Sequence, residues 1–475
     1  MSYENYEVVI GLEVHVELNT RTKIFCACPT EFGGEPNTRV CPVCLGLPGA
    51  LPVLNREVVR LAAKAGLALG CTVSPLSGQD RKNYFYPDLP KAYQISQYDR
   101  PLCVGGALVI DTPEGKKPIG ITRIHIEEDA GKLIHDDALG TLIDYNRCGI
   151  PLIEIVSEPD LRSAEEAKSY LQALRSLLRY VGVSDCRMNE GSFRADVNLS
   201  VRKKGDSRLG VRTEIKNLNS FAFAAKAIEY EASRQILVLE SGKAVERETR
   251  RFDPATGKTE AMRKKESAAD YRFFPDPDLP PVRLSEEEIA SLRHSLPELP
   301  AEKRARFTQS LGLSEYDASL LSSDRLLGEY FDEAAGATPY PKLVANLIAT
   351  EVLRLTEAED FHCPIATARI ASLATLLGEN KISGATAKKL LARLWKADLD
   401  PQKTVEDENL GQINDRDLLL SLVRETLAAN PRSVADYHAG KTRAAGALVG
   451  QAMSRSAGRA NPALLSELIE RELKK

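Results

Sequence analysis

The sequence predicts a multidomain α+β protein, and three observations support that fold class. The chain has 475 residues, which is too long for one ordinary domain. Residues 1 to about 285 are rich in Gly, Pro and alternating apolar and polar positions, which predicts a β-rich domain of mixed or antiparallel strands with some helices. From about residue 297, Leu, Ala, Glu and Lys recur at three- and four-residue spacing, which predicts helices.

Two predicted boundaries divide the chain into domains. The first is the stiff segment 273–281, because proline removes a hydrogen-bond donor and restricts the residue before it. The second lies at Pro401 and the acidic stretch 406–408. We therefore predict a β-rich domain at 1–292, an all-α domain at 293–403 and a small all-α tail domain at 404–475.

Composition excludes several classes of protein. Hydrophobic residues make up 43% and charged residues 27%, as in soluble globular proteins, and no apolar run approaches the length of a membrane span. The N-terminus has no signal-peptide pattern, and nine cysteines in such a chain indicate a reducing compartment. The net charge of −4 says little about partners, but a protein that binds nucleic acid only by bulk attraction is usually basic, so any RNA would need a local basic patch.

The segment 8–18 has the alternation of a β-strand. One face would carry the apolar side chains of Val8, Ile10, Leu12, Val14 and Val16. The other face would carry Glu13, His15 and Glu17, and two carboxylates beside an imidazole can bind a divalent cation. The alternative is the solvated face of an edge strand.

Glu154 lies inside the apolar run 151–157, which is typical of a buried strand. A buried carboxylate needs a cation, a proton, hydrogen bonds or a basic partner, since burying it alone is costly. A helix should follow, with Ser163 and Glu166 forming a capping box and Gly182 ending it. Its apolar stripe would comprise Ala167, Tyr170, Leu171, Leu174, Leu177, Leu178 and Val181.

Three consecutive acids end a third candidate strand, at 123–132. Alternation places Ile124, Ile126 and Glu128 on one face. The other face would carry Arg123, His125, Glu127 and Asp129. Mutual repulsion of the acids favours a bound cation or a raised pKa.

The segments 194–202 and 211–216 should pair as a hairpin with one apolar face. The outer face would carry Arg194, Asp196, Asn198, Ser200, Arg202, Arg212, Glu214 and Lys216. Acids mixed with fixed cations suit a site for phosphate and magnesium, and cross-strand ion pairs are the alternative. No Walker motif or kinase-type glycine loop occurs, so a nucleotide site here would not use a common fold.

Four cysteines form two close pairs, Cys26 with Cys28 and Cys41 with Cys44, separated by twelve residues. Four thiolates at this spacing can surround one tetrahedral zinc ion. Such a zinc ion would be structural, because all four positions around it are occupied. Free or redox-active thiols are the alternative.

Two groups of residues are candidates for binding RNA. The segment 80–94 interleaves basic and aromatic residues, which suits phosphate contacts and stacking on unpaired bases, although a packed loop is the alternative. Its candidates are Lys82, Tyr84, Tyr86 and Lys91. In the tail, short amphipathic helices offer Lys441, Arg443, Arg455 and Arg459.

Taken in order, these segments resemble the B subunits of tRNA-dependent amidotransferases. The motifs are GLEVH, DRKNYFYPDLPKAYQISQ, RIHIEEDAGK, PLIEIVSEPDLRS, RADVNLSVR, EIKNLNS and YRFFPDPDLPP. They cover residues 5–285 densely, and the resemblance resumes at 440–450, which is similar to the family's helical tail domain. The middle helices match in character more than in motif.

The resemblance implies a reaction and a site. ATP and magnesium would serve to phosphorylate the side-chain carboxylate on a tRNA misacylated with glutamate or aspartate, and ammonia would then attack the acyl phosphate. The first domain, the family's cradle, would hold magnesium and phosphate with Glu13, His15, Glu128, Glu154, Asp196 and Glu214. We expect further cofactor contacts from Lys216, Arg194, Asn198 and Ser157. Zinc would act as a structural clip or help to place the acceptor end of the tRNA.

Partner subunits are also implied. Glutamine hydrolysis needs an activated Ser or Cys, and no convincing nucleophile motif occurs. The resemblance therefore implies a cytoplasmic heterotrimer with an amidase (A) subunit that supplies ammonia from glutamine and a small C subunit. The enzyme would be a ligase that forms a carbon–nitrogen bond. Two other hypotheses stay open: a non-catalytic tRNA-binding scaffold, and a metal-dependent hydrolase that needs neither ATP nor partners.

Overall fold

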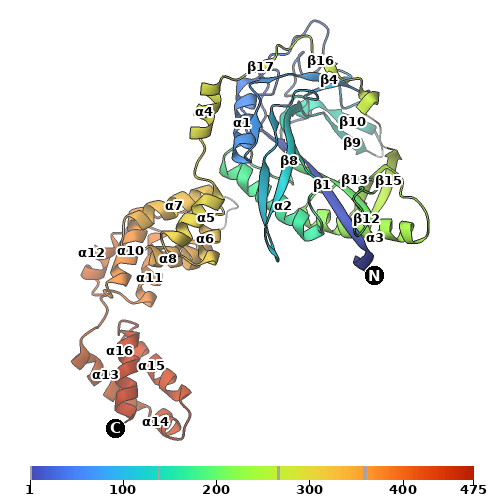
Figure 1. Cartoon of the computed structure of the whole chain (residues 1–475). Helices are drawn as coiled ribbons and strands as arrows, with labels where there is room; N and C mark the ends of the chain where they lie inside the picture. The colour runs from blue at the N-terminus through green and yellow to red at the C-terminus, as the bar shows by residue number, and fades with distance from the viewer. Residues whose placement is uncertain (1–2, 137, 265–267, 357–360, 475) are drawn as a thin grey trace. The chain divides into compact units, whose positions relative to one another are not determined.

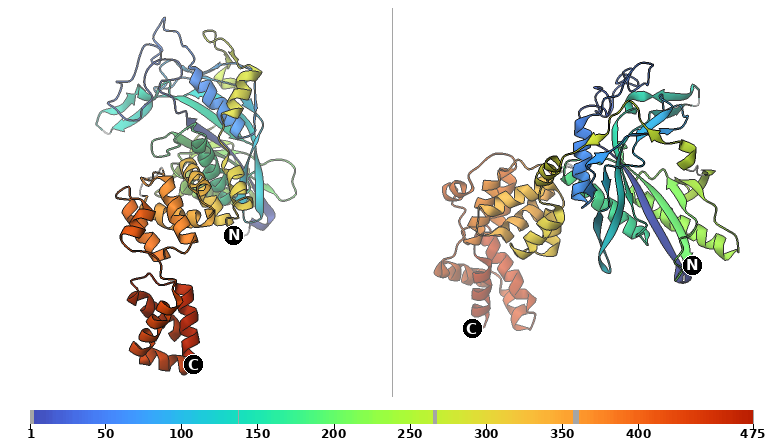
Figure 2. Two further views of the ribbon diagram at one scale, coloured as in Figure 1. Left: turned by 90° about the vertical axis from the view of Figure 1, so that its left-hand side faces the viewer. Right: turned by 45° about the horizontal axis from the view of Figure 1, so that its top comes forward.

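The computed structural model describes residues 3–136, 138–264, 268–356 and 361–474. The chain forms two compact units, Met1–Leu299 and Pro300–Lys475. The first unit combines strands with helices, and the second is built of helices (Figures 1 and 2). The predicted fold class is therefore confirmed. The domain limits that we predicted at 292/293 and 403/404 stay predictions.

A ten-stranded sheet forms the framework of the first unit (Figure 1). Its strands lie in the order β15-β14-β13-β12-β1-β11-β8-β6-β2, and β7 pairs with β8. Their bounds are β1 Tyr6–Glu17, β2 Thr72–Val73, β6 Cys103–Val104, β7 Ala107–Thr112, β8 Gly115–Glu128, β11 Pro151–Ser157, β12 Phe193–Lys203, β13 Thr213–Lys216, β14 Glu248–Asp253 and β15 Lys258–Lys264. The predicted strands and the antiparallel pairing of β12 with β13 are confirmed.

Strand β1 lies in the middle of the sheet and shows the predicted alternation. Ile10, Leu12, Val14 and Val16 are buried in the core, whereas Val8 is only partly buried. β1 runs antiparallel to β12 on one side and to β11 on the other. The register of these strands therefore sets which polar side chains meet on the opposite face of the sheet.

Three helices pack against the apolar face of the sheet, namely α1 Arg56–Ala68, α2 Ala164–Tyr180 and α3 Phe221–Glu240. As predicted, Ser163 caps α2, because its Oγ accepts from Glu166 N at 3.1 Å. The prediction of a full capping box is wrong. The Glu166 carboxylate accepts from Arg162 N at 2.8 Å and lies 2.8 Å from Lys117 Nζ, so its oxygens are engaged by these groups and not by the Ser163 backbone N–H.

Short strands and one more helix complete the first unit. The strands are β3 Leu76–Ser77, β4 Asp80–Asn83, β5 Tyr93–Ser96, β9 Lys132–Asp136, β10 Gly140–Asp144, β16 Phe274–Pro275 and β17 Val282–Arg283, and the helix is α4 Glu286–His294. They form three small sheets, ordered β16-β4-β5, β10-β9 and β17-β3. The proline-rich segment supplies only β16, at an edge of its sheet, where a missing donor is tolerated.

The second unit buries two separate hydrophobic cores, one between Phe307 and Val405 and one between Leu419 and Leu473. Its helices are α5 Pro300–Gln309, α6 Glu315–Leu321, α7 Arg325–Gly336, α8 Pro341–Leu347, α9 Leu353–Leu355, α10 Thr367–Gly378, α11 Gly384–Leu394, α12 Pro401–Asp407, α13 Arg416–Ala429, α14 Pro431–His438, α15 Arg443–Arg455 and α16 Pro462–Leu473. Across the described part of the chain, every helix is too short or too polar to cross a lipid bilayer.

Candidate functional site

An imidazole and two carboxylates meet on the polar face of the sheet, and we call them the first cluster: His15, Glu127 and Glu154. His15 on β1 lies directly opposite Glu154 on β11. His15 Nε2 is 3.4 Å from Glu127 Oε1 and 3.6 Å from Glu154 Oε2. The three side chains come from three neighbouring strands, so the pairing of β1, β11 and β8 creates the cluster.

A second histidine lies beside the carboxylates of the first cluster. His125 Nε2 is 3.1 Å from Glu154 Oε2 and 3.6 Å from Glu127 Oε2, and the side chain is buried. Although burial acts to lower it, the two carboxylates raise the pKa of His125 to about 9. The protonated imidazole in turn holds the pKa of Glu154 below its usual value, against the effect of burial. His125 therefore balances the negative charge of this cluster.

The first cluster fits a magnesium ion. Neighbouring ligands of an octahedral ion with bonds of about 2.1 Å lie about 3 Å apart, so the distances from His15 to Glu127 and Glu154 need only a small contraction. Imidazole and carboxylate are a ligand set that divalent cations accept. Ser96 Oγ donates to Glu127 Oε2 at 3.4 Å and helps to fix that carboxylate.

Three further carboxylates form a second cluster, Glu13, Asp196 and Glu214. Glu13 on β1 lies opposite Asp196 on β12, and Glu214 belongs to the next strand, β13. Glu13 and His15 are two residues apart on the same face of β1, so the two clusters lie about 7 Å from each other along the strand. The sheet thus presents two potential cation sites side by side.

Neutral and basic side chains orient the second cluster. Asn198 Nδ2 donates to Glu13 Oε1 at 2.9 Å, and Thr249 Oγ1 donates to Glu214 Oε2 at 2.8 Å. Lys216 Nζ lies 2.6 Å from Asp196 Oδ2 and 3.5 Å from Glu214 Oε1. Despite burial, these two carboxylates raise the pKa of Lys216. Lys216 and Asn198, which we predicted as cofactor contacts, therefore lie in direct contact with the carboxylates.

The structure does not bring Glu128 to either cluster. It lies on the opposite face of β8 from Glu127, because successive side chains alternate along a strand. There it forms an ion pair with Lys91 and accepts from Ile95 N at 2.8 Å. The alternation of the sequence already placed Glu128 on the face opposite to that of His125 and Glu127. The shared face of His125 and Glu127 was therefore the sequence signal that Glu127, which we did not select, belongs to the site.

Two other predicted cofactor contacts have structural partners. Arg194 Nη2 is 3.0 Å from Asp129 Oδ1, and Arg147 pairs with both Asp129 and Glu17. Although burial acts to raise it, Arg194 and Arg147 hold the pKa of Asp129 below its usual value. Ser157 Oγ accepts from Leu12 N at 2.9 Å and donates to the Glu158 carbonyl at 3.0 Å, so it joins β1 to the end of β11.

The predicted RNA contacts of 80–94 are divided between partly buried and exposed positions. Lys82 Nζ lies 4.8 Å from the ring centre of Tyr271. The charges of His125 and His15 lower the pKa of Glu154 most, and the charge of Lys82 adds to their effect, so Lys82 is near the first cluster. Tyr84 is partly buried, whereas Tyr86 is exposed. Phe85, which we did not select, is 78% exposed, so its ring is more accessible than that of either tyrosine.

A cavity of about 150 Å³ adjoins the Lys91–Glu128 ion pair. It is lined by Phe25, Cys26, Val43, Cys44, Gly46, Leu47, Ala50, Pro52, Lys91, Tyr93, Ile95, Glu128 and Gly149. Lys91 Nζ lies 5.5 Å from the ring centre of Phe25 and 5.4 Å from that of Tyr93. Lys91 is thus an enclosed cation, which a solvent-exposed RNA contact would not require.

The predicted cations of the tail domain lie at its surface. Lys441 Nζ is 2.9 Å from Asp436 Oδ1, and Arg455 Nη1 is 4.0 Å from Glu425 Oε2. Arg443 begins α15, and Arg459 donates to the Asn409 carbonyl at 2.9 Å. The ion pairs of Lys441 and Arg455 are exposed and contribute little to stability, so a change of partner at these two cations costs little.

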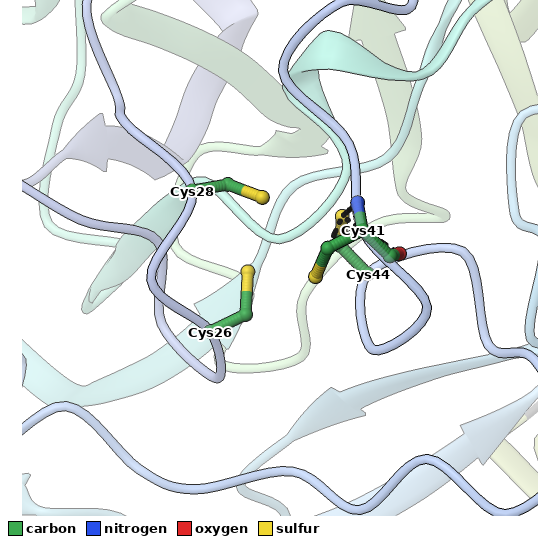
Figure 3. Close-up of side chains that lie close together, drawn as sticks. All are labelled: Cys26, Cys28, Cys41 and Cys44. Carbon is green, nitrogen blue, oxygen red and sulfur yellow. Dashed lines mark hydrogen bonds between the residues drawn. The ribbon is translucent and has the colours of Figure 1, made fainter.

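The four predicted zinc ligands converge. Figure 3 shows the sulfur atoms of Cys26, Cys28, Cys41 and Cys44 directed toward a common centre, and all lie within 4.8 Å of one another. The Sγ atoms of Cys41 and Cys44 are 3.9 Å apart, which matches the edge of a tetrahedron with Zn–S bonds of about 2.3 Å. A hydrogen bond from the Cys26 thiol lowers the pKa of Cys44 to about 5, which favours the thiolate that a metal binds.

A buried lysine supports the cysteine cluster. Lys23 is fully buried, and its Nζ donates to the Arg39 carbonyl at 2.8 Å and lies 3.7 Å from Cys44 Sγ. Four thiolates around one zinc ion leave a net negative charge, which this ammonium group reduces. The residues present therefore fit a structural zinc ion.

Comparison with known proteins decides the family. The GatB/GatE catalytic domain matches residues 8–290, and a GatB domain matches residues 329–473. The chain belongs to the GatB family. The resemblance based on the sequence motifs is thus confirmed.

GatB proteins from several bacteria are similar to this chain over its whole length. The B subunit of the aspartyl/glutamyl-tRNA(Asn/Gln) amidotransferase of Caldicellulosiruptor saccharolyticus is 53% identical over 477 residues, which cover 99% of each chain. The proteins of the same name from Caldanaerobacter subterraneus and Carboxydothermus hydrogenoformans are 53% and 52% identical, each over 99% of this chain. Both clusters and the four cysteines fall within the matched catalytic domain.

Proposed function

We propose that this chain carries the ATP-dependent activation step of a tRNA-dependent amidotransferase. The side-chain carboxylate of glutamate or aspartate, carried by Glu-tRNA(Gln) or Asp-tRNA(Asn), attacks the γ-phosphorus of ATP, and ADP leaves. Ammonia then displaces phosphate from the acyl phosphate and forms Gln-tRNA or Asn-tRNA. The overall reaction is that of a ligase that forms a carbon–nitrogen bond with glutamine as amido donor.

The observation that carries this proposal is the pair of acidic clusters on one face of the sheet. His15, Glu127 and Glu154 would hold one magnesium ion, and Glu13, Asp196 and Glu214 would hold the other. Bound magnesium supplies charge neutralisation for the phosphate oxygens. Glu127 takes the role that we predicted for Glu128, and Lys216 and Asn198 keep the second set of carboxylates in position.

Partners and compartment follow from the same proposal. The similar proteins carry the name of a B subunit, which supports an assembly with an amidase (A) subunit as the source of ammonia and a small C subunit. Misacylated tRNA would contact Lys82, Tyr84, Phe85 and Tyr86 near the first cluster and the cations of the tail domain. Zinc would be a structural ion of the cradle, and the complex would work in the cytoplasm.

The test uses the assembled complex. Misacylated tRNA should stimulate magnesium-dependent ATP hydrolysis, and glutamine should convert the product to the amide. A complex with Glu154→Gln should bind tRNA as well as the wild type and hydrolyse ATP at least 100-fold more slowly. If the wild-type complex binds misacylated tRNA without any ATP hydrolysis, the chain is a scaffold and the proposal is wrong.

A further inference from the structure

Arg123 occupies a fixed place on the face that carries both acidic clusters. It lies on β8 opposite Val156 of β11, and Val156 lies opposite Glu13 of β1. Residues that are directly opposite in antiparallel strands point to the same face of the sheet. Arg123, Val156 and Glu13 therefore form one row, next to the row of His125, Glu154 and His15.

Arg123 differs from Lys216, Arg194 and Arg147 in having no carboxylate partner within the described residues. Its Nε atom is buried and has no hydrogen-bond partner there. Leaving such a donor unpaired costs free energy, so a buried N–H group is normally satisfied by an acceptor. The residue as a whole is only partly buried, so a ligand can reach its guanidinium. Two residues along the strand, His125 Nδ1 is also buried without a partner in the described chain.

Three other cations near the clusters are committed to carboxylates. Lys216 pairs with Asp196, and Arg194 pairs with Asp129. Arg147 pairs with Asp129 and with Glu17. An anionic ligand that approaches the clusters would therefore compete with an existing ion pair at each of these positions, but not at Arg123.

Arg123 also lies within reach of such a ligand. Neighbouring strands are about 4.8 Å apart, so roughly 10 Å separates the backbone of Arg123 from that of Glu13 across β11. The side chain between them, Val156, is uncharged and offers no competing acceptor. An extended arginine covers much of this span, and a polyphosphate held over the clusters would cover the rest.

We propose that Arg123 binds a phosphate group of the nucleotide whose metal ions the two acidic clusters hold. This inference rests on the proposed function and adds to it a phosphate ligand that the motifs did not indicate. A guanidinium can donate two parallel hydrogen bonds to phosphate oxygens, which a lysine cannot do. Arg123 would thereby offset the negative charge that the metal ligands leave on this face.

The test compares Arg123→Met and Arg123→Lys with Arg202→Met in the assembled complex. Arg202 lies on β12 of the same sheet but pairs with Glu7, so it is a matched control. In Arg123→Met, kcat/KM for ATP in the tRNA-stimulated hydrolysis should fall about 30-fold or more, as expected for lost charge-assisted hydrogen bonds. Arg123→Lys should recover part of the loss, and Arg202→Met should match the wild type.

A second measurement separates phosphate binding from a structural role. Inorganic tripolyphosphate should inhibit the wild-type and Arg202→Met complexes equally and both Arg123 variants at least tenfold more weakly, with tRNA affinity unchanged. If the wild type hydrolyses ATP and either Arg123 variant keeps wild-type kcat/KM for ATP and wild-type inhibition, the inference is overturned while the proposed function stands. A wild-type complex without ATP hydrolysis overturns the proposed function itself.

Discussion

His15 of β1 and Glu154 of β11 face each other in the sheet, with His15 Nε2 3.6 Å from Glu154 Oε2. The two residues are far apart in the sequence, and only the pairing of the two strands brings them together. A shift of one residue in that pairing would turn one of them into the core. The cation site therefore depends on the register of β1 against β11.

The first prediction separates two adjacent glutamates. Glu127→Gln should raise the magnesium concentration needed for half-maximal ATP hydrolysis at least tenfold, because a neutral amide is a poor magnesium ligand. Glu128→Gln is the matched control and should leave this concentration unchanged, since Glu128 lies on the other face of β8. Titration of each complex with magnesium measures both values. If Glu128→Gln raised the required magnesium concentration and Glu127→Gln did not, Glu128 would be the ligand.

The second prediction concerns pH. The pKa of His125 is raised from 6.5 to about 9 in the folded chain, so its stabilising contribution is complete below pH 6.5 and is lost as the pH rises through 9. In the metal-free full-length chain, this loss amounts to at most about 3 kcal/mol. His125→Gln cannot take up the proton and should show a smaller decrease in the free energy of unfolding over that range. Denaturant unfolding in EDTA at several pH values measures this free energy for both chains. Parallel curves of the free energy of unfolding against pH for the wild type and His125→Gln would contradict the prediction.

The third prediction concerns zinc. The wild-type chain should contain about one zinc ion, and Cys41→Ser should lose most of it and unfold at a lower temperature. Cys363→Ser is the control, because this cysteine lies outside the cluster. Elemental analysis and thermal unfolding give both quantities. Equal zinc contents in the wild type and in Cys41→Ser would exclude the four-cysteine site.

The fourth prediction concerns the tail domain. Replacement of Lys441, Arg443 and Arg455 by alanine should weaken tRNA binding. The slope of log affinity against log salt concentration should become less steep by up to about three, about one for each lost phosphate contact. Arg416→Ala removes another exposed tail cation, which pairs with Glu467, and should have a smaller effect. Binding isotherms over a range of salt concentrations test this. An unchanged salt slope in the triple variant would assign the tail another role.

Local patterns in the sequence predicted much of the fold. Alternation along 8–18 identified β1 and its two faces, Ser163 marked the start of α2, and the helical spacing from about residue 297 indicated the helices of the second unit. These features depend on neighbouring residues and on backbone geometry, which a short window of sequence contains. The spacing of the four cysteines likewise predicted their convergence.

The sequence by itself determined the family, the strands, the helices and the types of side chain available for a metal or a phosphate. The tertiary structure decided which of them meet: it joined Glu127 to His15 and Glu154, turned Glu128 toward Lys91, and left Arg123 without a carboxylate among the described residues. Strand order and ion pairing are non-local, because they depend on contacts between residues that are distant in the chain. Alternation fixes which side chains share a face, but only the packed sheet fixes their neighbours across it.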